Sequence, residues 1–405
     1  MERSTTRQLL SLAAYLLLWT GAFAKEIPVS PGKDTLVKAL KGAGKGDVVV
    51  LKDGTYSGSF SITSGVTIQG APSMKSIITG SLETAISLAG EEVVIRNLVV
   101  IGNKKTRIGL KAGLHSLRIE GCRFENLSKG IIFEGSPLCD VVCSSFIDCE
   151  TGIECSRKTA PTVWGCLFMR GKLGIACDAS APYIRNSLFC AQATCVRAVN
   201  LEEGPRIRHS VFVRSSGPAI DLSGRIMNLA VRNNILHECA RTAADSKGAE
   251  GFSHNILSPG KTRAGAARDD TIVAGQRANI VEKLSITVQK DGAITVAESP
   301  AMAKGIGEPW QPKGTAGRIG FDAPAFKPGK LEHLKAAPPP RWTEPYVANS
   351  VNEEYQCLAM WGLTSRGQRL ISKEEKHMDV LVTNRAEKEP EITFDVSRFY
   401  GDNFR

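Results

Sequence analysis

Short stretches of alternating apolar and polar residues recur at a nearly constant spacing along the chain. Eight seven-residue segments align with one another: residues 94–100, 118–124, 140–146, 162–168, 183–189, 206–212, 230–236 and 251–257. Their last residues follow one another after 24, 22, 22, 21, 23, 24 and 21 residues. A series of this length predicts a repeat architecture in which each repeat packs on the next.

Within each segment, the pattern predicts a strand, a bend and a second strand. The second residue is always apolar and its neighbours are often polar, which is typical of a strand with one buried face: Ile95, Ile119, Val141, Val163, Ile184, Ile207, Val231 and Phe252. The fourth residue is often Asn or Gly, which tolerate left-handed backbone: Asn97, Gly121, Cys143, Gly165, Asn186, His209, Asn233 and His254. We therefore expect a bend there, and a structural role for His209.

A further alternating strand precedes the segments at residues 130–133, 152–155, 174–177 and 219–222, and more loosely at 194–198. Three short strands cannot bury a face alone, but stacked repeats can. We predict an all-β parallel solenoid of about nine rungs. Residues 25–70 form an N-terminal cap and first rung, with a short helix at 35–40 capped by Asp34. The β-helix spans 71–325, and 326–405 are a linker and C-terminal extension of unassigned fold.

The first 24 residues have the features of a signal peptide. Arg3 and Arg7 precede an apolar stretch at residues 9–19, and Ala22 and Ala24 form a small-residue cleavage site. This predicts a secreted or periplasmic protein that begins near Lys25, with no membrane insertion of the mature chain. An uncleaved N-terminal anchor is the alternative.

The formal net charge of +10 suits an acidic partner. Acidic polysaccharide, cell-wall polymer and nucleic acid all qualify, although export argues against nucleic acid. A basic surface that is merely solvated is the alternative, and the oligomeric state stays open.

Ten of the eleven cysteines lie between Cys122 and Cys239. No C-x-x-C occurs and histidine is sparse, so we expect no metal site. Several cysteines fall at inward positions of adjacent rungs, where they pack as small apolar residues. Cys155 and Cys177 share one such position, and a disulfide between them is the alternative.

The segment 47–56 (DVVVLKDGTY) resembles the first rung of bacterial right-handed β-helix proteins, and residues 94–98 (VIRNL) resemble a rung of the pectate-lyase-like superfamily. Residues 299–302 and 317–320 resemble the close of such helices. The resemblance covers residues 29–325 and implies a right-handed parallel β-helix. The resemblance does not identify an activity, because this superfamily includes lyases, hydrolases, epimerases and non-enzymes. Its calcium and catalytic signatures are absent, so no cofactor is predicted.

Two columns of outward side chains carry the candidate site. The third position of the segments gives Arg96, Glu120, Val142, Trp164, Arg185, Arg208, Arg232 and Ser253, and the first gives Val94, Arg118, Asp140, Thr162, Tyr183, Arg206, Ala230 and Gly251. The resemblance implies that ligands lie along this face. Stacked guanidiniums suit the carboxylates of an acidic polysaccharide, and Trp164 and Tyr183 offer flat surfaces to sugar rings.

β-Elimination of a uronic acid needs a cation on the carboxylate, a base and an acid. We assign the carboxylate contact and proton abstraction to Arg208 with Arg206 beside it, and protonation of the leaving oxygen to Tyr183. Arg185 and Arg232 hold flanking acidic sugars, and Trp164 stacks on a ring. Calcium could also neutralise the carboxylate, but no calcium motif is present.

Three alternatives remain open. Glu120 and Asp140 would suit an inverting glycoside hydrolase, unless they only form ion pairs with Arg96 and Arg118. The protein would otherwise be a non-catalytic polysaccharide-binding or surface-structural β-helix. The arginines themselves would otherwise be a solvated ladder with loop acids such as Glu202, Glu203 and Asp221 as partners.

Overall fold

The computed structural model of the 405-residue chain describes residues 24–90, 92–113, 117–135, 139–157, 159, 161–227, 229–243, 251–258, 279–289, 294–296, 299–300, 302, 325–326, 346–347, 365–373, 376–383 and 391–395. The signal peptide predicted at 1–24 lies outside this part except for Ala24, as do the 317–320 segment and most of the predicted linker and extension at 326–405. These interpretations stay predictions.

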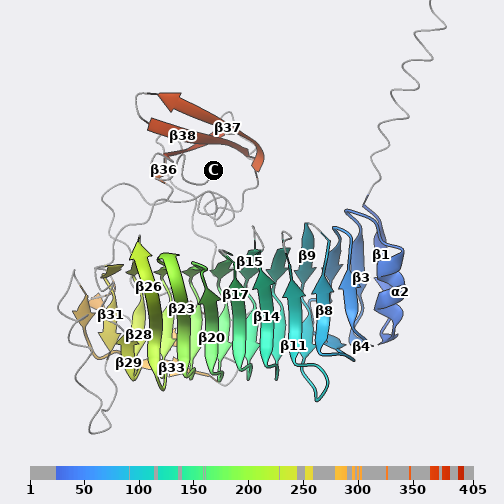
Figure 1. Ribbon diagram of the computed structural model, residues 1–405, viewed down its shortest axis with the longest axis horizontal. Helices are drawn as coiled ribbons and strands as arrows, with labels where there is room; N and C mark the ends of the chain where they lie inside the picture. Colours follow the sequence, from blue (N-terminus) through green and yellow to red (C-terminus); the bar gives the residue numbers. More distant parts are fainter. Residues whose placement is uncertain are drawn as a thin grey trace, which may run out of the picture.

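Three parallel sheets run side by side along one axis and form a β-solenoid of about nine turns (Figure 1). Sheet 1 consists of β1 (Glu26–Val29), β3 (Val48–Leu51), β6 (Thr67–Gln69), β9 (Val93–Arg96), β12 (Leu117–Glu120), β15 (Cys139–Val142), β18 (Thr162–Trp164), β21 (Tyr183–Arg185), β24 (Arg206–Arg208), β27 (Ala230–Arg232) and β30 (Phe252–Ser253). Each strand pairs with the strand one rung away, so the all-β solenoid predicted from the repeat is confirmed.

Sheet 2 follows the bend in each rung. It consists of β2 (Gly32–Lys33), β4 (Gly54–Ser57), β7 (Ser76–Thr79), β10 (Val99–Ile101), β13 (Arg123–Glu125), β16 (Ser145–Ile147), β19 (Leu167–Met169), β22 (Leu188–Cys190), β25 (Val211–Val213), β28 (Ile235–His237), β31 (Ile256–Ser258) and β32 (Ile280–Val281). Sheet 3 consists of β5 (Phe60–Ile62), β8 (Thr84–Leu88), β11 (Ile108–Ala112), β14 (Lys129–Glu134), β17 (Thr151–Ser156), β20 (Leu173–Asp178), β23 (Thr194–Glu203), β26 (Pro218–Met227) and β29 (Arg241–Ala243).

The bend between sheets 1 and 2 has left-handed backbone at each of the eight predicted positions. Their φ angles lie between 46° and 64°, including 51° at His209. The ring of His209 is fully buried, and its Nε2 lies 3.3 Å from Nδ2 of Asn233 on the next rung. The predicted bend is therefore confirmed, and His209 occupies it as a structural residue.

The core is built from columns that run along the solenoid axis. The eight apolar second residues, from Ile95 to Phe252, are at most 2% exposed. Beside them the rings of Phe124, Phe146, Phe168, Phe189 and Phe212 stack with centroids 4.6–5.2 Å apart and planes within 6°. Glycine makes room for this column, because a Cβ at Gly152 would lie 2.7 Å from the Phe168 ring.

Most of the described cysteines belong to this core, and the described cysteines form no disulfide with one another. Cys155 and Cys177 pair in register and face inward, as predicted, with exposures of 1% and 4%. Burial raises the pKa of the Cys122 and Cys166 thiols to about 12, so both stay protonated at neutral pH. The interior packing role is confirmed for these thiols.

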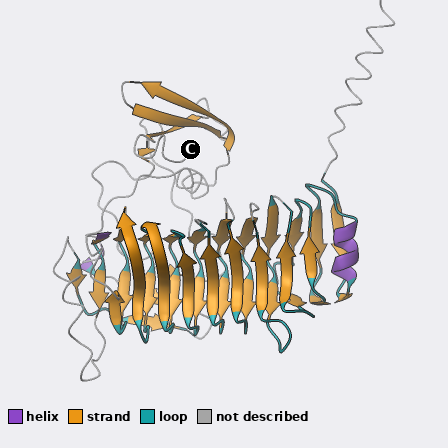
Figure 2. Cartoon of the chain, viewed as in Figure 1, coloured by secondary structure: helices purple, strands orange, loops and turns teal. Residues whose placement is uncertain are grey.

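Helix α2 (Thr35–Lys41) closes the N-terminal end of the solenoid, where it contacts β1, β2 and β5 (Figure 2). The predicted capping helix is thus confirmed. Asp34 is its N-cap residue, but it has φ 59° and its side chain makes no capping hydrogen bond. The predicted side-chain cap is wrong, because in this left-handed conformation the carboxylate does not bond the first turn.

The parallel pairing of the solenoid sheets ends at β32. The next strands, β33 (Ile286–Val288), β34 (Ile294–Val296) and β35 (Ala325–Phe326), form a small antiparallel sheet. Apolar residues of this region, including Leu284, Ile286 and Val296, pack against the side of sheet 2 that faces away from the core, forming a second cluster with Leu188 and Val211. Strands β33 and β34 therefore cover the solenoid rather than extend it.

A separate C-terminal sheet has the order β36 (Tyr346–Val347), β39 (Glu391–Asp395), β38 (Lys376–Thr383) and β37 (Ser365–Lys373). These strands belong to the C-terminal extension, whose fold the sequence analysis did not assign. No helix in the described residues is long and apolar enough to cross a membrane.

Candidate functional site

The register of sheet 1 brings the two predicted columns together. Trp164, Arg185, Arg208 and Arg232 are successive partners on β18, β21, β24 and β27, and Tyr183 pairs with Arg206 in the adjacent column. Partners on neighbouring strands lie about 4.8 Å apart. We refer to Trp164, Tyr183, Arg185, Arg206, Arg208 and Arg232 as the basic row.

Most of the basic row is buried. Arg185 is 1% exposed, Arg208 2%, Trp164 4% and Tyr183 6%, whereas Arg206 and Arg232 are partly exposed. The alternative of a solvated ladder is therefore wrong for Arg185 and Arg208. Alternation along a strand fixes which face a side chain occupies, but it does not reveal what lies over that face.

The guanidinium of Arg208 packs against an aromatic ring within the basic row. Its Cζ lies 5.8 Å from the centroid of the Tyr183 ring, which is within the range of a cation–π interaction. The phenol and the guanidinium assigned to one elimination reaction therefore lie side by side.

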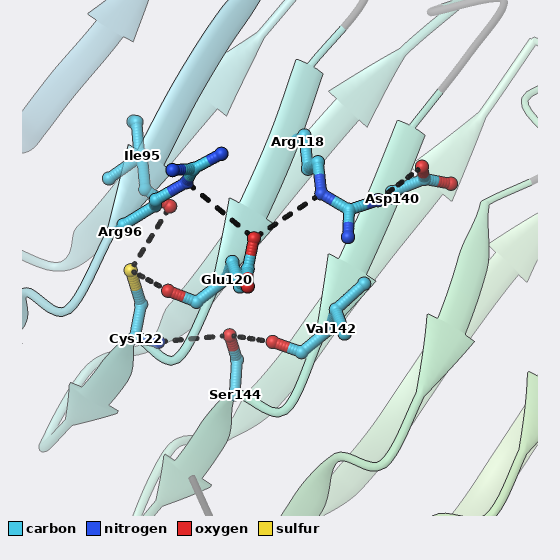
Figure 3. Close-up of polar contacts among 8 residues, drawn as sticks. All are labelled: Ile95, Arg96, Arg118, Glu120, Cys122, Asp140, Val142 and Ser144. Carbon is cyan, nitrogen blue, oxygen red and sulfur yellow. Dashed lines mark hydrogen bonds and ion pairs between the residues drawn. The ribbon is translucent and has the colours of Figure 1, made fainter. Parts of the chain in front are cut away.

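The acid pair lies on earlier rungs and takes part in an ion-pair network (Figure 3). Arg118 lies between the two carboxylates, with its Nε 3.4 Å from Glu120 and its Nη1 3.2 Å from Asp140. Arg96 approaches Glu120 from the other side, at 3.6 Å. The predicted ion pairs are thus present, and both carboxylates already contact cations.

Asp140 nevertheless has an unusual environment. Burial raises the pKa of its carboxyl above the ordinary value, and the charge of Arg118 only partly offsets this effect. Its side chain is still 42% exposed, so water screens the interaction with Arg118.

The loop acids expected near the basic row differ in their placement. Asp221 lies on β26 of sheet 3 and forms an ion pair with Arg197 of the neighbouring strand, at 3.7 Å. The expectation that Asp221 pairs with the arginines of sheet 1 is therefore wrong, because Asp221 lies on sheet 3. The side chains of Glu202 and Glu203 lie outside the described residues.

No group of three or more His, Cys, Asp or Glu side chains with the geometry of a metal site occurs in the described part of the chain. The positive charge of the candidate site is carried instead by the arginines of the basic row.

A family model described as the right-handed β-helix region matches residues 63–203. The match covers 141 of the 405 residues. Together with the parallel sheets, it identifies the solenoid as a right-handed parallel β-helix, the fold that the resemblance to the pectate-lyase-like superfamily implied. None of the curated proteins matches the sequence.

Solved structures with similar folds are only distantly alike. A PL6 family alginate lyase is 12% identical, with 82% of this chain and 63% of that chain covered and a TM-score of 0.37. A PL6 alginate lyase in complex with a trisaccharide is 11% identical (68% and 66% covered, TM-score 0.36), and a pectin methylesterase from Aspergillus niger is 15% identical (61% and 93% covered, TM-score 0.31). At these identities and TM-scores, the similarity does not assign any activity to this chain.

Proposed function

We propose that the protein binds acidic, uronic-acid-containing polysaccharide along sheet 1 and cleaves it by β-elimination. The observation that carries this proposal is the strand register, which places three guanidiniums in one column and Tyr183 with Arg206 in the next. Guanidiniums bind carboxylates through paired hydrogen bonds, and a row of them suits a polymer with repeated carboxylates.

The basic row holds candidates for the cation and for the acid of the elimination. Arg208 and Arg206 neutralise the carboxylate, which acidifies the neighbouring C–H. A base takes that proton, a carbon–carbon double bond forms, and the bond to the leaving glycosidic oxygen breaks while the oxygen gains a proton. Tyr183 has the hydroxyl for such proton transfer. Because a guanidinium keeps its proton in proteins, Arg208 serves better as an electrostatic catalyst than as the base.

The partly exposed members of the basic row are the natural first contacts of a long polymer. Arg206 and Arg232 are partly exposed to solvent, whereas Arg185 and Arg208 are buried and must become exposed before a sugar can contact them. We infer that binding starts at Arg206 and Arg232 and reaches Arg208 after a local rearrangement. Arg185 and Arg232 would hold acidic sugars on either side of Arg208, with Trp164 beside Arg185.

We further propose that the protein is exported. The signal-peptide features of residues 1–24 and the positive net charge both favour a secreted or periplasmic protein that meets acidic polymer rather than nucleic acid.

The burial of Arg185 and Arg208 favours a second candidate, a polysaccharide-binding or structural β-helix without catalysis. An inverting hydrolase that uses Glu120 and Asp140 has less support, because both carboxylates are held in ion pairs.

A screen of the purified protein against alginate, polygalacturonate and neutral glycans tests the proposal. β-Elimination creates an unsaturated sugar end, so ultraviolet absorbance should rise with the acidic polymers only. New reducing ends without that absorbance would instead identify a hydrolase. Binding of acidic polymer without either signal would support the non-catalytic candidate.

A further inference from the structure

The ring of His237 lies beside the apolar layer that covers the outer face of sheet 2. His237 occupies the third position of β28, with Val213 and Ser258 as its partners on the adjacent rungs, and it is 6% exposed. Earlier rungs carry apolar side chains in the same column, namely Met169, Cys190 and Val213, which belong to the second apolar cluster. A titratable group therefore lies at the end of an apolar column.

The layer over sheet 2 is attached through apolar contacts and through Ser258. Leu284, Ile286, Val296 and Met302 form one cluster with the outer side chains of sheet 2, and we refer to them as the cover. The cover residues are at most 8% exposed. The backbone N–H of Leu284 donates a buried hydrogen bond of 2.8 Å to Oγ of Ser258. Ser258 therefore fixes the beginning of the cover to sheet 2.

Ser258 also connects the cover to the imidazole. Its Oγ lies 3.0 Å from Nδ1 of His237, and both groups are buried. The amide of Leu284 can only donate, and in the neutral imidazole Nδ1 can accept the hydroxyl hydrogen of Ser258. A protonated imidazole carries hydrogen on both nitrogens, so this hydroxyl loses its acceptor. The contact that holds the cover thus depends on the protonation state of His237.

The charged groups around the ring do not offset the cost of burying a charge there. Oε2 of Glu238 lies 3.8 Å from Nε2 of His237 and favours protonation, but Arg214 binds the same oxygen at 2.8 Å and opposes it. On the side of the cover, Glu282 accepts a hydrogen bond from a serine hydroxyl and Lys283 is exposed. Burial is the largest influence, and it lowers the pKa of His237 below its ordinary value of 6.5.

We propose that His237 is a pH-sensitive switch, which holds the cover on sheet 2 while the ring is neutral and releases the cover when the ring is protonated. A charged imidazole beside apolar side chains is unfavourable, and release lets water reach it. The outer side chains Leu188, Val211 and Ile235 would then become exposed, while the parallel sheets keep their pairing. This property goes beyond the proposed function and does not depend on it.

The direction of the pH effect follows from the pKa of His237 in the two states. With the cover in place this pKa lies below 6.5, and after release, when water solvates the ring, it returns toward that value. The released state therefore binds more protons between the two pKa values. Attachment of the cover is fully present above pH 6.5 and is lost as the pH falls toward the lowered pKa.

Hydrogen exchange of the full protein, followed by mass spectrometry, measures the release of the cover. Peptides that contain Leu284 and β33 are compared with peptides from β21 and β24 at about pH 7.5 and about pH 5.5, after correction for the intrinsic pH dependence of exchange. We expect exchange of the cover peptides to rise by up to about tenfold at the lower pH, because the released state takes up a proton there. Peptides from β21 and β24 should stay protected.

Two variants assign the effect to His237. His237→Gln keeps a polar side chain next to Ser258 but cannot be protonated, so exchange of its cover peptides should no longer change with pH after the same correction. His254→Gln is the matched control. Burial also lowers the pKa of His254, but this residue lies at the bend after β30, outside the contact with Ser258. Its cover peptides should respond to acid as in the wild type.

Three results would overturn the proposal. The first is equal exchange of the wild-type cover at both pH values. The second is an acid-induced increase that persists in His237→Gln, because another group would then be responsible. The third is simultaneous exchange of the cover, β21 and β24, which would indicate acid unfolding of the whole solenoid. Should His237→Gln not fold, the wild-type comparison of the cover with β21 and β24 still decides between local release and global unfolding.

Discussion

Replacing Ile184 with Asp is expected to abolish the folded state. Ile184 is fully buried on β21, with Val163 and Ile207 as its partners on the two adjacent rungs. A carboxylate there would have only apolar neighbours in its column, and an unpaired buried charge costs several kcal/mol. A loss of about 5 kcal/mol or more is comparable with the whole stability of many proteins.

The matched control is Ser87→Asp, which places the same residue at an exposed position of β8, beside Lys111 in register. Far-ultraviolet circular dichroism and denaturant unfolding compare both variants with the wild type. The wild type and Ser87→Asp should show β structure with little helix and a cooperative transition. A folded Ile184→Asp protein, or a helix-dominated wild-type spectrum, would contradict the solenoid.

Exchanging Arg208 for Ala is expected to lower turnover of acidic polysaccharide by about 10²–10³-fold. Removal of one preorganised electrostatic contact to the developing negative charge commonly costs 10²–10³ in rate, and Arg208 also packs on the proposed proton-transfer residue Tyr183. Initial rates of absorbance increase measure kcat and KM. Circular dichroism must first show that the variant is folded, because Arg208 is buried.

Glu120→Gln in the same assay distinguishes the two enzymatic interpretations. It keeps the shape of the side chain and removes the charge that contacts Arg96 and Arg118. Turnover should stay within a few fold of the wild type if the basic row is the site. Loss of turnover in Glu120→Gln with retention in Arg208→Ala would favour the acid-pair hydrolase.

Periodicity predicted the fold well because the solenoid depends on local patterns. Alternation around Ile184 identified the buried face, and the recurrence from Phe168 to Phe189 fixed the rung length. Asn and Gly at the fourth position predicted a left-handed bend. The structure confirms this bend even at His209 and Cys143, which replace Asn or Gly there. The register that brings Tyr183 beside Arg206 followed from the same alignment.

What packs on the outside of the rungs was not predictable in the same way. The near-complete burial of Arg185 and Arg208 depends on tertiary contacts, which strand alternation does not encode. Strands β33 and β34 pair antiparallel and do not continue the parallel sheets, because their apolar residues cover the outer side chains of sheet 2.

The most direct test of the account is whether acidic polymer binds at the basic row rather than to positive charge in general. Arg232→Glu and Lys172→Glu change the net charge equally, but Arg232 lies in the basic row and Lys172 is an exposed partner of Glu150 outside it. Oligogalacturonate is titrated into the wild type and both variants at low salt. The account predicts that Arg232→Glu loses most of the affinity while Lys172→Glu stays close to the wild type; equal affinities in the two variants, or no binding by the wild type, would contradict it.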